Sequence, residues 1–149
     1  MKDRLTRGFI AGLLAGIVMN GENYLTFYAL NFADLRHLDW AAALVFGHPP
    51  TNILETAFAQ IVQLFFAGLA GILFAYLVPF VTSRNHLLKG WIYGVLVWWV
   101  AYALTIMFRL PGLVTITLET AVSNVIGASL YGLVLAALLR WLEQRAEAA

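Results

Sequence analysis

Three glutamates lie in apolar surroundings and are the side chains of this chain best suited to chemistry. Glu22 lies well past the middle of the first long apolar segment, while Glu55 and Glu119 each lie at the start of a later one. A carboxylate inside a bilayer costs on the order of 3 kcal/mol unless it is paired, hydrated or protonated. Glu22 is therefore expected to face a bundle interior or a water-filled cavity and is the leading functional candidate. The alternative is a hydrogen-bonded glutamate that locks helix packing.

Carboxamide side chains recur at a similar depth. They are Asn20 and Asn23 in the first segment, Gln60 and Gln63 in the second, and Asn124 in the last. If the segments pack around one centre, these amides and the three glutamates predict an acidic pocket that opens outward and binds a cation, a proton, an amine or a lipid headgroup. As the alternative, amides inside membranes join helices by hydrogen bonds worth about 0.6–2 kcal/mol each.

Glu55 and Glu119 also fit a purely structural role at the start of a helix. Asn52 precedes Glu55 by three residues, which is the spacing of a capping box. Glu119 would lie at the positive end of its helix dipole, with Thr115 or Thr117 as the N-cap.

Further polar candidates lie in the predicted outer loop: His37, Asp39 and His48. No pair of them has the spacing of a metal site, so we predict no metal and no cofactor. Hydrolase motifs are absent. A membrane-embedded lipid-modifying enzyme would require one of these three residues to meet a glutamate.

Composition places these residues in a membrane protein. Apolar residues make up 62% of the 149 and charged residues 11%, against roughly half and a quarter in soluble domains. Four apolar segments are long enough to cross about 30 Å of hydrocarbon; they are Gly8–Phe32, Ile53–Phe80, Leu87–Phe108 and Thr117–Trp141. Backbone groups in lipid must be satisfied within the segment, so we predict an all-α domain over residues 1–149 with four transmembrane helices.

The chain reads as a tandem repeat of two helix pairs in parallel orientation, residues 5–82 and 87–142. Leu54-Glu55-Thr56-Ala57 returns as Leu118-Glu119-Thr120-Ala121, and this alignment pairs Gln60 with Asn124 and Gly68 with Gly132. Independent helices with similar capping are the alternative. Gly8, Gly12 and Gly16 form a stripe that lets another helix approach closely, either inside the monomer or between two copies.

The first repeat has an extra outer loop at residues 34–51. Within it, Asp39 is predicted to N-cap a short apolar helix from Trp40 to Phe46, and Gly47 to end that helix. This helix is too short to span a bilayer, so it is expected to lie at the interface or to re-enter the membrane. It is interpreted either as a functional element or as a cover for one end of the bundle.

Charge predicts the orientation. Seven of the nine lysines and arginines fall on the side that carries both termini. The positive-inside rule then places both termini in the cytoplasm of a multi-pass inner-membrane protein. A net charge of +1 offers no basic face for nucleic acid, and the absence of cysteine excludes disulfides and thiol chemistry.

The Gly8-Phe9-Ile10-Ala11-Gly12 opening, with Gly90 and Gly94 opening the third segment, resembles small four-span bacterial inner-membrane proteins of unknown function. That resemblance implies a fold and a location but no activity. A carboxylate in the first of four spans is also similar to small multidrug transporters, as an analogy only.

The sequence supports two hypotheses for the function of the protein. The first is a small transport or ion-conducting protein, expected to be a homo-oligomer, that uses Glu22 in an outward pocket. The second is a non-catalytic assembly subunit of a larger membrane complex, in which the glycine faces and the outer loop are docking surfaces.

Overall fold

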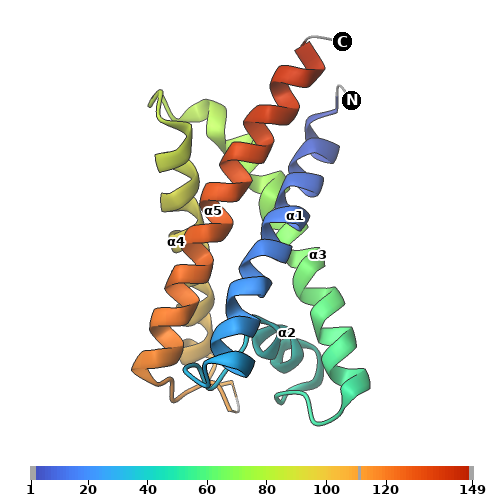
Figure 1. Cartoon of the computed structure of the whole chain (residues 1–149), viewed down its shortest axis with the longest axis vertical. Helices are drawn as coiled ribbons and strands as arrows, with labels where there is room; N and C mark the ends of the chain where they lie inside the picture. Colours follow the sequence, from blue (N-terminus) through green and yellow to red (C-terminus); the bar gives the residue numbers. More distant parts are fainter. Residues whose placement is uncertain (1–2, 111, 148–149) are drawn as a thin grey trace.

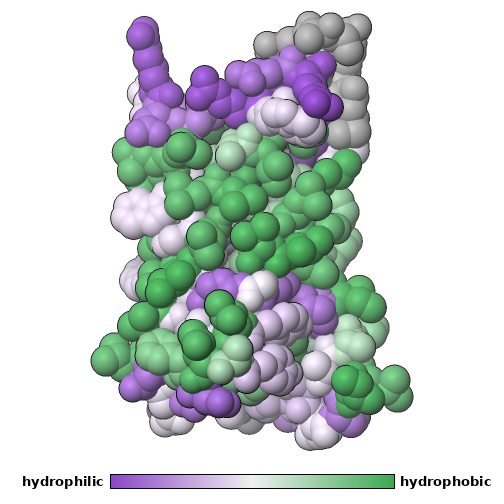
Figure 2. Space-filling view, viewed as in Figure 1, coloured by the Kyte–Doolittle hydropathy of each residue, from purple (hydrophilic) through white to green (hydrophobic). Residues whose placement is uncertain are grey.

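The computed structural model describes residues 3–110 and 112–147, which form helices and loops and contain no strand (Figure 1). The elements are α1 (Arg4–Tyr24), continued by a π-helical turn (Leu25–Ala29), α2 (His37–Phe46), α3 (Ile53–Leu77), continued by a 3-10 turn (Val78–Phe80), α4 (His86–Met107) and α5 (Leu118–Glu147). Within the described residues, three helices are long and apolar enough to cross a membrane: Ile53–Phe80, His86–Met107 and Leu118–Ala146. Figure 2 shows hydrophobic side chains across the middle of the face in view.

The long helices stand side by side in the order α3, α1, α5, α4, with both ends of the chain at one end of the bundle (Figure 1). α1 packs against α3 and α5, and α5 packs against α4, but α3 and α4 hardly touch. The short helix α2 lies at the end opposite the termini and packs against α3. The gap that α3 and α4 leave between them is where the candidate site lies.

Glycines allow the closest helix contacts. A Cβ at Gly71 of α3 would overlap the Gly8 carbonyl oxygen and lie 2.6 Å from the Cα of Gly12, both on α1. In the same way, a Cβ at Gly132 of α5 would overlap the carbonyl oxygen of Gly90 on α4. The predicted close approach at the glycine stripe is thus confirmed, and it occurs inside the monomer. Neither helix pair could pack this closely with side chains at these positions.

The start of α2 differs from the prediction. The helix begins at His37, Arg36 is its N-cap residue, and Asp39 is already its third residue. The Asp39 carboxylate reaches back and accepts the Arg36 backbone N–H at 2.6 Å, while its other oxygen accepts from the Arg36 guanidinium at 2.8 Å. The prediction of Asp39 as N-cap was wrong because a carboxylate at the third position caps equally well from inside the helix. Gly47 ends the helix as predicted, with φ +78°.

The N-caps of α3 and α5 are the residues that the sequence predicted. Asn52 Oδ1 accepts the Glu55 backbone N–H at 2.9 Å and so caps α3, as predicted. Thr117 Oγ1 accepts the Thr120 backbone N–H at 3.4 Å at the start of α5. Both caps lie at the end of the bundle opposite the termini.

Candidate functional site

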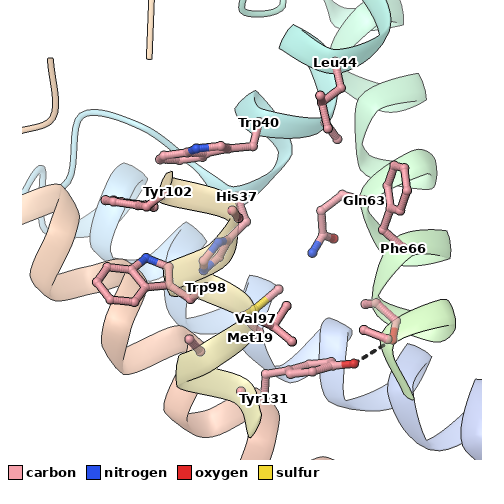
Figure 3. Close-up of a pocket in the computed structure, with 16 residues that line it drawn as sticks. Met19, His37, Trp40, Leu44, Gln63, Phe66, Val97, Trp98, Tyr102 and Tyr131 are labelled. Atoms are coloured by element: carbon pink, nitrogen blue, oxygen red, sulfur yellow. Dashed lines mark hydrogen bonds between the residues drawn. The ribbon is translucent and has the colours of Figure 1, made fainter. Parts of the chain in front are cut away.

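A cavity of about 270 Å³ lies below α2, in the gap between α3 and α4, with α1 and α5 behind it (Figure 3). Its walls are rich in aromatic rings: Trp40 from α2, Phe66 from α3, Trp98 and Tyr102 from α4, and Tyr131 from α5. The Tyr131 hydroxyl donates to the Ala67 carbonyl at 2.6 Å and so bridges α5 to α3 across the cavity floor. Phe66 is about half exposed and lies at the cavity rim.

Contacts on both sides hold α2 over this cavity. The Trp40 ring stacks on Tyr102 with centroids 5.4 Å apart, and its Nε1–H donates to Thr105 Oγ1 at 3.1 Å. On the other side, the buried Leu38 packs in a small apolar cluster with Ala59 of α3. α2 therefore links α3 to α4 at the end where these two helices do not meet each other.

A chain of polar side chains joins α1, α2 and α5 behind the cavity. Asn23 Oδ1 accepts the His37 backbone N–H at 2.7 Å, and Asn23 Nδ2 donates to Ser123 Oγ at 3.3 Å. Ser123 Oγ lies 2.8 Å from Thr26 Oγ1 and donates to Glu22 Oε1 at 3.3 Å. One carboxylate oxygen of Glu22 is thus fixed by neighbouring side chains.

The other oxygen of Glu22 is not fixed. Glu22 Oε2 and His37 Nε2 are both buried, and neither has a hydrogen-bond partner among the described residues. A Cβ at Gly127 would lie 2.8 Å from His37 Nε2 and 3.0 Å from Glu22 Oε2, so both atoms border the space that this glycine leaves open. A buried polar group without a partner costs roughly 1–3 kcal/mol, so two such atoms in one place call for a functional reason.

The charge state of His37 follows from its surroundings. Part of the residue is exposed, but its Nε2 is buried, and burial lowers the pKa of His37 to about 4. Its imidazole is therefore neutral near pH 7, since removing water disfavours the charged ring. A neutral imidazole in the cavity wall does not repel a positively charged ligand.

The predicted amides act mainly as links between helices. Asn20 Nδ2 on α1 donates to Gln63 Oε1 at 2.8 Å, and Gln60 Nε2 donates to the same oxygen at 3.2 Å. Asn124 Nδ2 donates to the Tyr102 hydroxyl at 2.9 Å, which joins α5 to α4. Gln63 also lines the cavity, and its amide points into it in Figure 3. The bonds from Asn20 and Asn124 are of the interhelical kind considered from the sequence, whereas the Gln60–Gln63 bond lies within α3.

The structure does not bring the other two glutamates to Glu22. Glu55 is partly exposed, and its Oε2 accepts from the Thr51 N–H at 2.8 Å and the Thr51 hydroxyl at 3.0 Å. Glu119 is exposed in the first turn of α5. His48 is exposed as well, and Asp39 is held by Arg36. No group of three His, Asp or Glu residues in the described parts of the chain is arranged to hold a metal ion.

Sequence reasoning did not predict which residues surround Glu22 Oε2. His37 was considered as an outer-loop residue that could meet a glutamate, but not as a neighbour of Glu22 in particular, and Gly127 was not named as a site residue. No periodic pattern could join them, because the contact brings together α1, the start of α2 and α5, which are far apart in the sequence. The signal that could have been used is the run of aromatic residues in α4, whose Trp98 and Tyr102 line one wall of the cavity.

No protein-family model matches this chain, and no curated protein or solved structure matches it either. Its long apolar helices agree with the resemblance to small membrane proteins only at the level of a helical membrane protein. Chemically, the cavity offers aromatic faces, which attract cations, and behind them a carboxyl oxygen without a partner.

Proposed function

We propose that the protein is a four-span inner-membrane transport protein for small organic cations, with both termini in the cytoplasm. α1 is the proposed fourth span. It carries Arg4, Arg7 and Glu22 and is therefore less apolar than the others. Its support comes from packing: α1 lies between α3 and α5 and packs against both, and with its π-helical turn it runs from Arg4 to Ala29. A helix between two spans that packs against both of them crosses the same thickness of bilayer.

The tandem repeat stays part of the proposal, with a changed register. Gly132 packs on α4 as Gly71 packs on α1, so Gly71 and not Gly68 is its counterpart. Gly68 instead lies against the ring of Phe9. The new register also pairs Gln63 with Asn124, and each of these amides hydrogen-bonds a neighbouring helix. The register predicted from the sequence aligned the starts of α3 and α5. The close glycine contacts of the helices support a register in which the first repeat is shifted by three residues against the second.

One observation carries the transport proposal: Glu22 Oε2 and His37 Nε2 are buried without partners next to Gly127, and His37 lines the aromatic cavity while Glu22 lies just outside its lining. Aromatic faces bind ammonium groups, with about 2 kcal/mol or more when the site is desolvated. An ionised Glu22 would add attraction for a cation, and protonation of Glu22 would remove it. Such a carboxyl group can therefore exchange a proton for a bound cation.

The volume of the cavity limits the size of the ligand that it can bind. A space of about 270 Å³ suits a single-ring amine or quaternary ammonium ion and lies near the lower end of small-molecule pockets. Benzyltrimethylammonium combines one aromatic ring with a permanent charge and is the probe we would use. Its charge does not titrate, so any pH dependence belongs to the protein.

The test is uptake of benzyltrimethylammonium into proteoliposomes that contain the purified protein. Glu22→Gln should lower uptake by about thirtyfold, because losing a charge interaction worth about 2 kcal/mol has that effect on affinity. Glu55→Gln is the matched control, since Glu55 is partly exposed and binds Thr51 at the start of its own helix, outside the cavity. Normal uptake by Glu22→Gln would remove Glu22 from the mechanism.

The assembly-subunit function remains the alternative because α3 and α4 hardly touch, which leaves room for a partner helix beside the cavity. This reading predicts that the protein extracted from its native membrane elutes with a larger complex. A partner-free, monodisperse protein from the same membrane would count against it.

A further inference from the structure

A second cavity, of about 310 Å³, lies at the opposite end of the bundle from the aromatic one, where both termini lie. The first turns of α1 and α4, the turn after α3 and the last turns of α5 enclose it. Its charged and titratable lining residues are Arg4, Arg7, His86, Lys89 and Glu143. Figure 2 shows that, on the face in view, this end of the molecule is hydrophilic and borders directly on the hydrophobic side chains across the middle.

Positive charge in this second cavity is not balanced. Arg4, Arg7 and Lys89 face a single carboxylate, Glu143, and none of the three forms an ion pair with a described residue. Arg7 Nε is buried and has no hydrogen-bond partner within the described parts of the chain. The nearby Asp3 does not supply one, because its carboxylate accepts the backbone N–H groups of α1's first turn.

The helix ends at the cavity do not change this charge balance. α1 and α4 begin at the cavity, but α3 and α5 end beside it, so two positive helix ends are offset by two negative ones. Lys89 Nζ donates to the carbonyl oxygens of Val78 and Val81, which fixes the turn after α3 and holds the ammonium group at the cavity edge. The arginines remain the groups free to bind an anion.

We propose that this cavity binds a phosphate group, carried either by the headgroup of an anionic phospholipid or by a free phosphate ion. Guanidinium groups bind phosphate oxygens through paired, charge-assisted hydrogen bonds, and Arg7 has an unused buried donor for one of them. Basic cavities between helices at the edge of the hydrocarbon region bind phospholipid headgroups in this way. The site shares no lining residue with the aromatic cavity, so it stands independently of the proposed transport function.

The experiment measures the thermal midpoint of the full chain in detergent on addition of phosphatidylglycerol, phosphatidylcholine or millimolar inorganic phosphate. The test variant is Arg4→Gln/Arg7→Gln. Arg140→Gln is the matched control, because Arg140 lies exposed in α5 toward the same end but outside the cavity. Arg4→Lys/Arg7→Lys keeps both charges and shows whether the site survives if the glutamine variant folds poorly.

We expect phosphatidylglycerol, but not phosphatidylcholine, to raise the midpoint of the wild-type protein and of Arg140→Gln. Each lost cation should weaken this binding roughly fivefold, and the double glutamine variant about twenty-fivefold. The lysine variant should keep most of the effect. Stabilisation by inorganic phosphate alone would identify the free ion as the ligand, and stabilisation by phosphatidylglycerol alone would identify the lipid.

Three outcomes would overturn the proposal. The first is a wild-type midpoint that neither phosphatidylglycerol nor phosphate changes. The second is an unchanged response in Arg4→Gln/Arg7→Gln, and the third is an equal loss in Arg140→Gln, which would indicate a diffuse charge effect. The uptake of organic cations is not involved in any of these readouts, so failure here leaves the transport proposal untouched.

Discussion

Two glycine-to-alanine substitutions test the helix packing in opposite directions. A Cβ at Gly132 would overlap the Gly90 carbonyl oxygen and lie 2.7 Å from its carbonyl carbon. Carbon atoms in contact prefer about 3.5–4.0 Å, so the backbone of α4 must move by roughly 1 Å. Gly21 on α1 is the matched control, because a Cβ there meets nothing within 4 Å.

The expected magnitudes follow from these contacts. Overpacking costs about 1–3 kcal/mol, and contact with rigid backbone places Gly132→Ala near the upper end of that range. Alanine favours the helix over glycine by up to about 1 kcal/mol, so Gly21→Ala should be neutral or slightly stabilising. The two variants should therefore differ by about 2–4 kcal/mol in the free energy of unfolding.

Unfolding in mixed detergent micelles, followed by circular dichroism, measures this difference. The same substitution at Gly71, which contacts α1 in the equivalent way, should behave like Gly132→Ala. Equal stabilities for Gly132→Ala and Gly21→Ala would refute the close packing of α4 against α5.

Three further predictions concern α2 and the groups around it. Trp40→Phe keeps an aromatic ring on Tyr102 but removes the hydrogen bond to Thr105, so the free energy of unfolding should fall by about 1 kcal/mol. Hydrogen exchange of the α2 amides should become faster. Unchanged exchange would argue that the bond to Thr105 does not hold α2 in place. Asp39→Ala removes the cap and leaves Arg36 without its ion-pair partner, so the thermal midpoint should fall by the equivalent of about 3 kcal/mol, against little change for the partly exposed Glu55→Gln. Burial lowers the pKa of His37 to about 4 from the ordinary 6.5, so below pH 6.5 the unfolded chain binds a proton that the folded chain does not. Stability should therefore fall between pH 6.5 and about 4, by roughly 2–3 kcal/mol in total, and His37→Gln should flatten that part of the profile. An identical profile in that variant would show that another group, such as Glu22 near the ring, controls the response.

Local patterns in the sequence predicted much of the fold. The second span was predicted as Ile53–Phe80 and appears with those bounds, because a cap at Asn52 and an apolar run are both local signals. Gly47 ends α2 as predicted, since the left-handed backbone there favours glycine. Asp39 was misplaced because capping from the third position depends on a side chain that folds back.

The sequence predicted only part of the candidate site. Glu22 was recognised from the cost of a carboxylate among apolar residues, and the structure leaves it half-buried with its Oε2 out of contact with solvent. The predicted neighbours Glu55 and Glu119 lie away from Glu22: Glu55 accepts hydrogen bonds from Thr51 at the start of α3, and Glu119 is exposed in the first turn of α5. His37 and Gly127 complete the site through a contact between residues far apart in the sequence. The helical periodicity of a single segment carries no information about such a contact.

The central claim is that Glu22 gives the aromatic cavity its preference for a cation, and equilibrium binding tests it most directly. The protein in nanodiscs is titrated with benzyltrimethylammonium and with neopentylbenzene, its uncharged isostere, while tryptophan fluorescence reports on Trp40 and Trp98 in the cavity wall. The wild-type protein should bind the cation about tenfold or more tightly than the isostere, and Glu22→Gln should lose this preference. Equal binding of both compounds by the wild-type protein, or an unchanged preference in Glu22→Gln, would contradict the account.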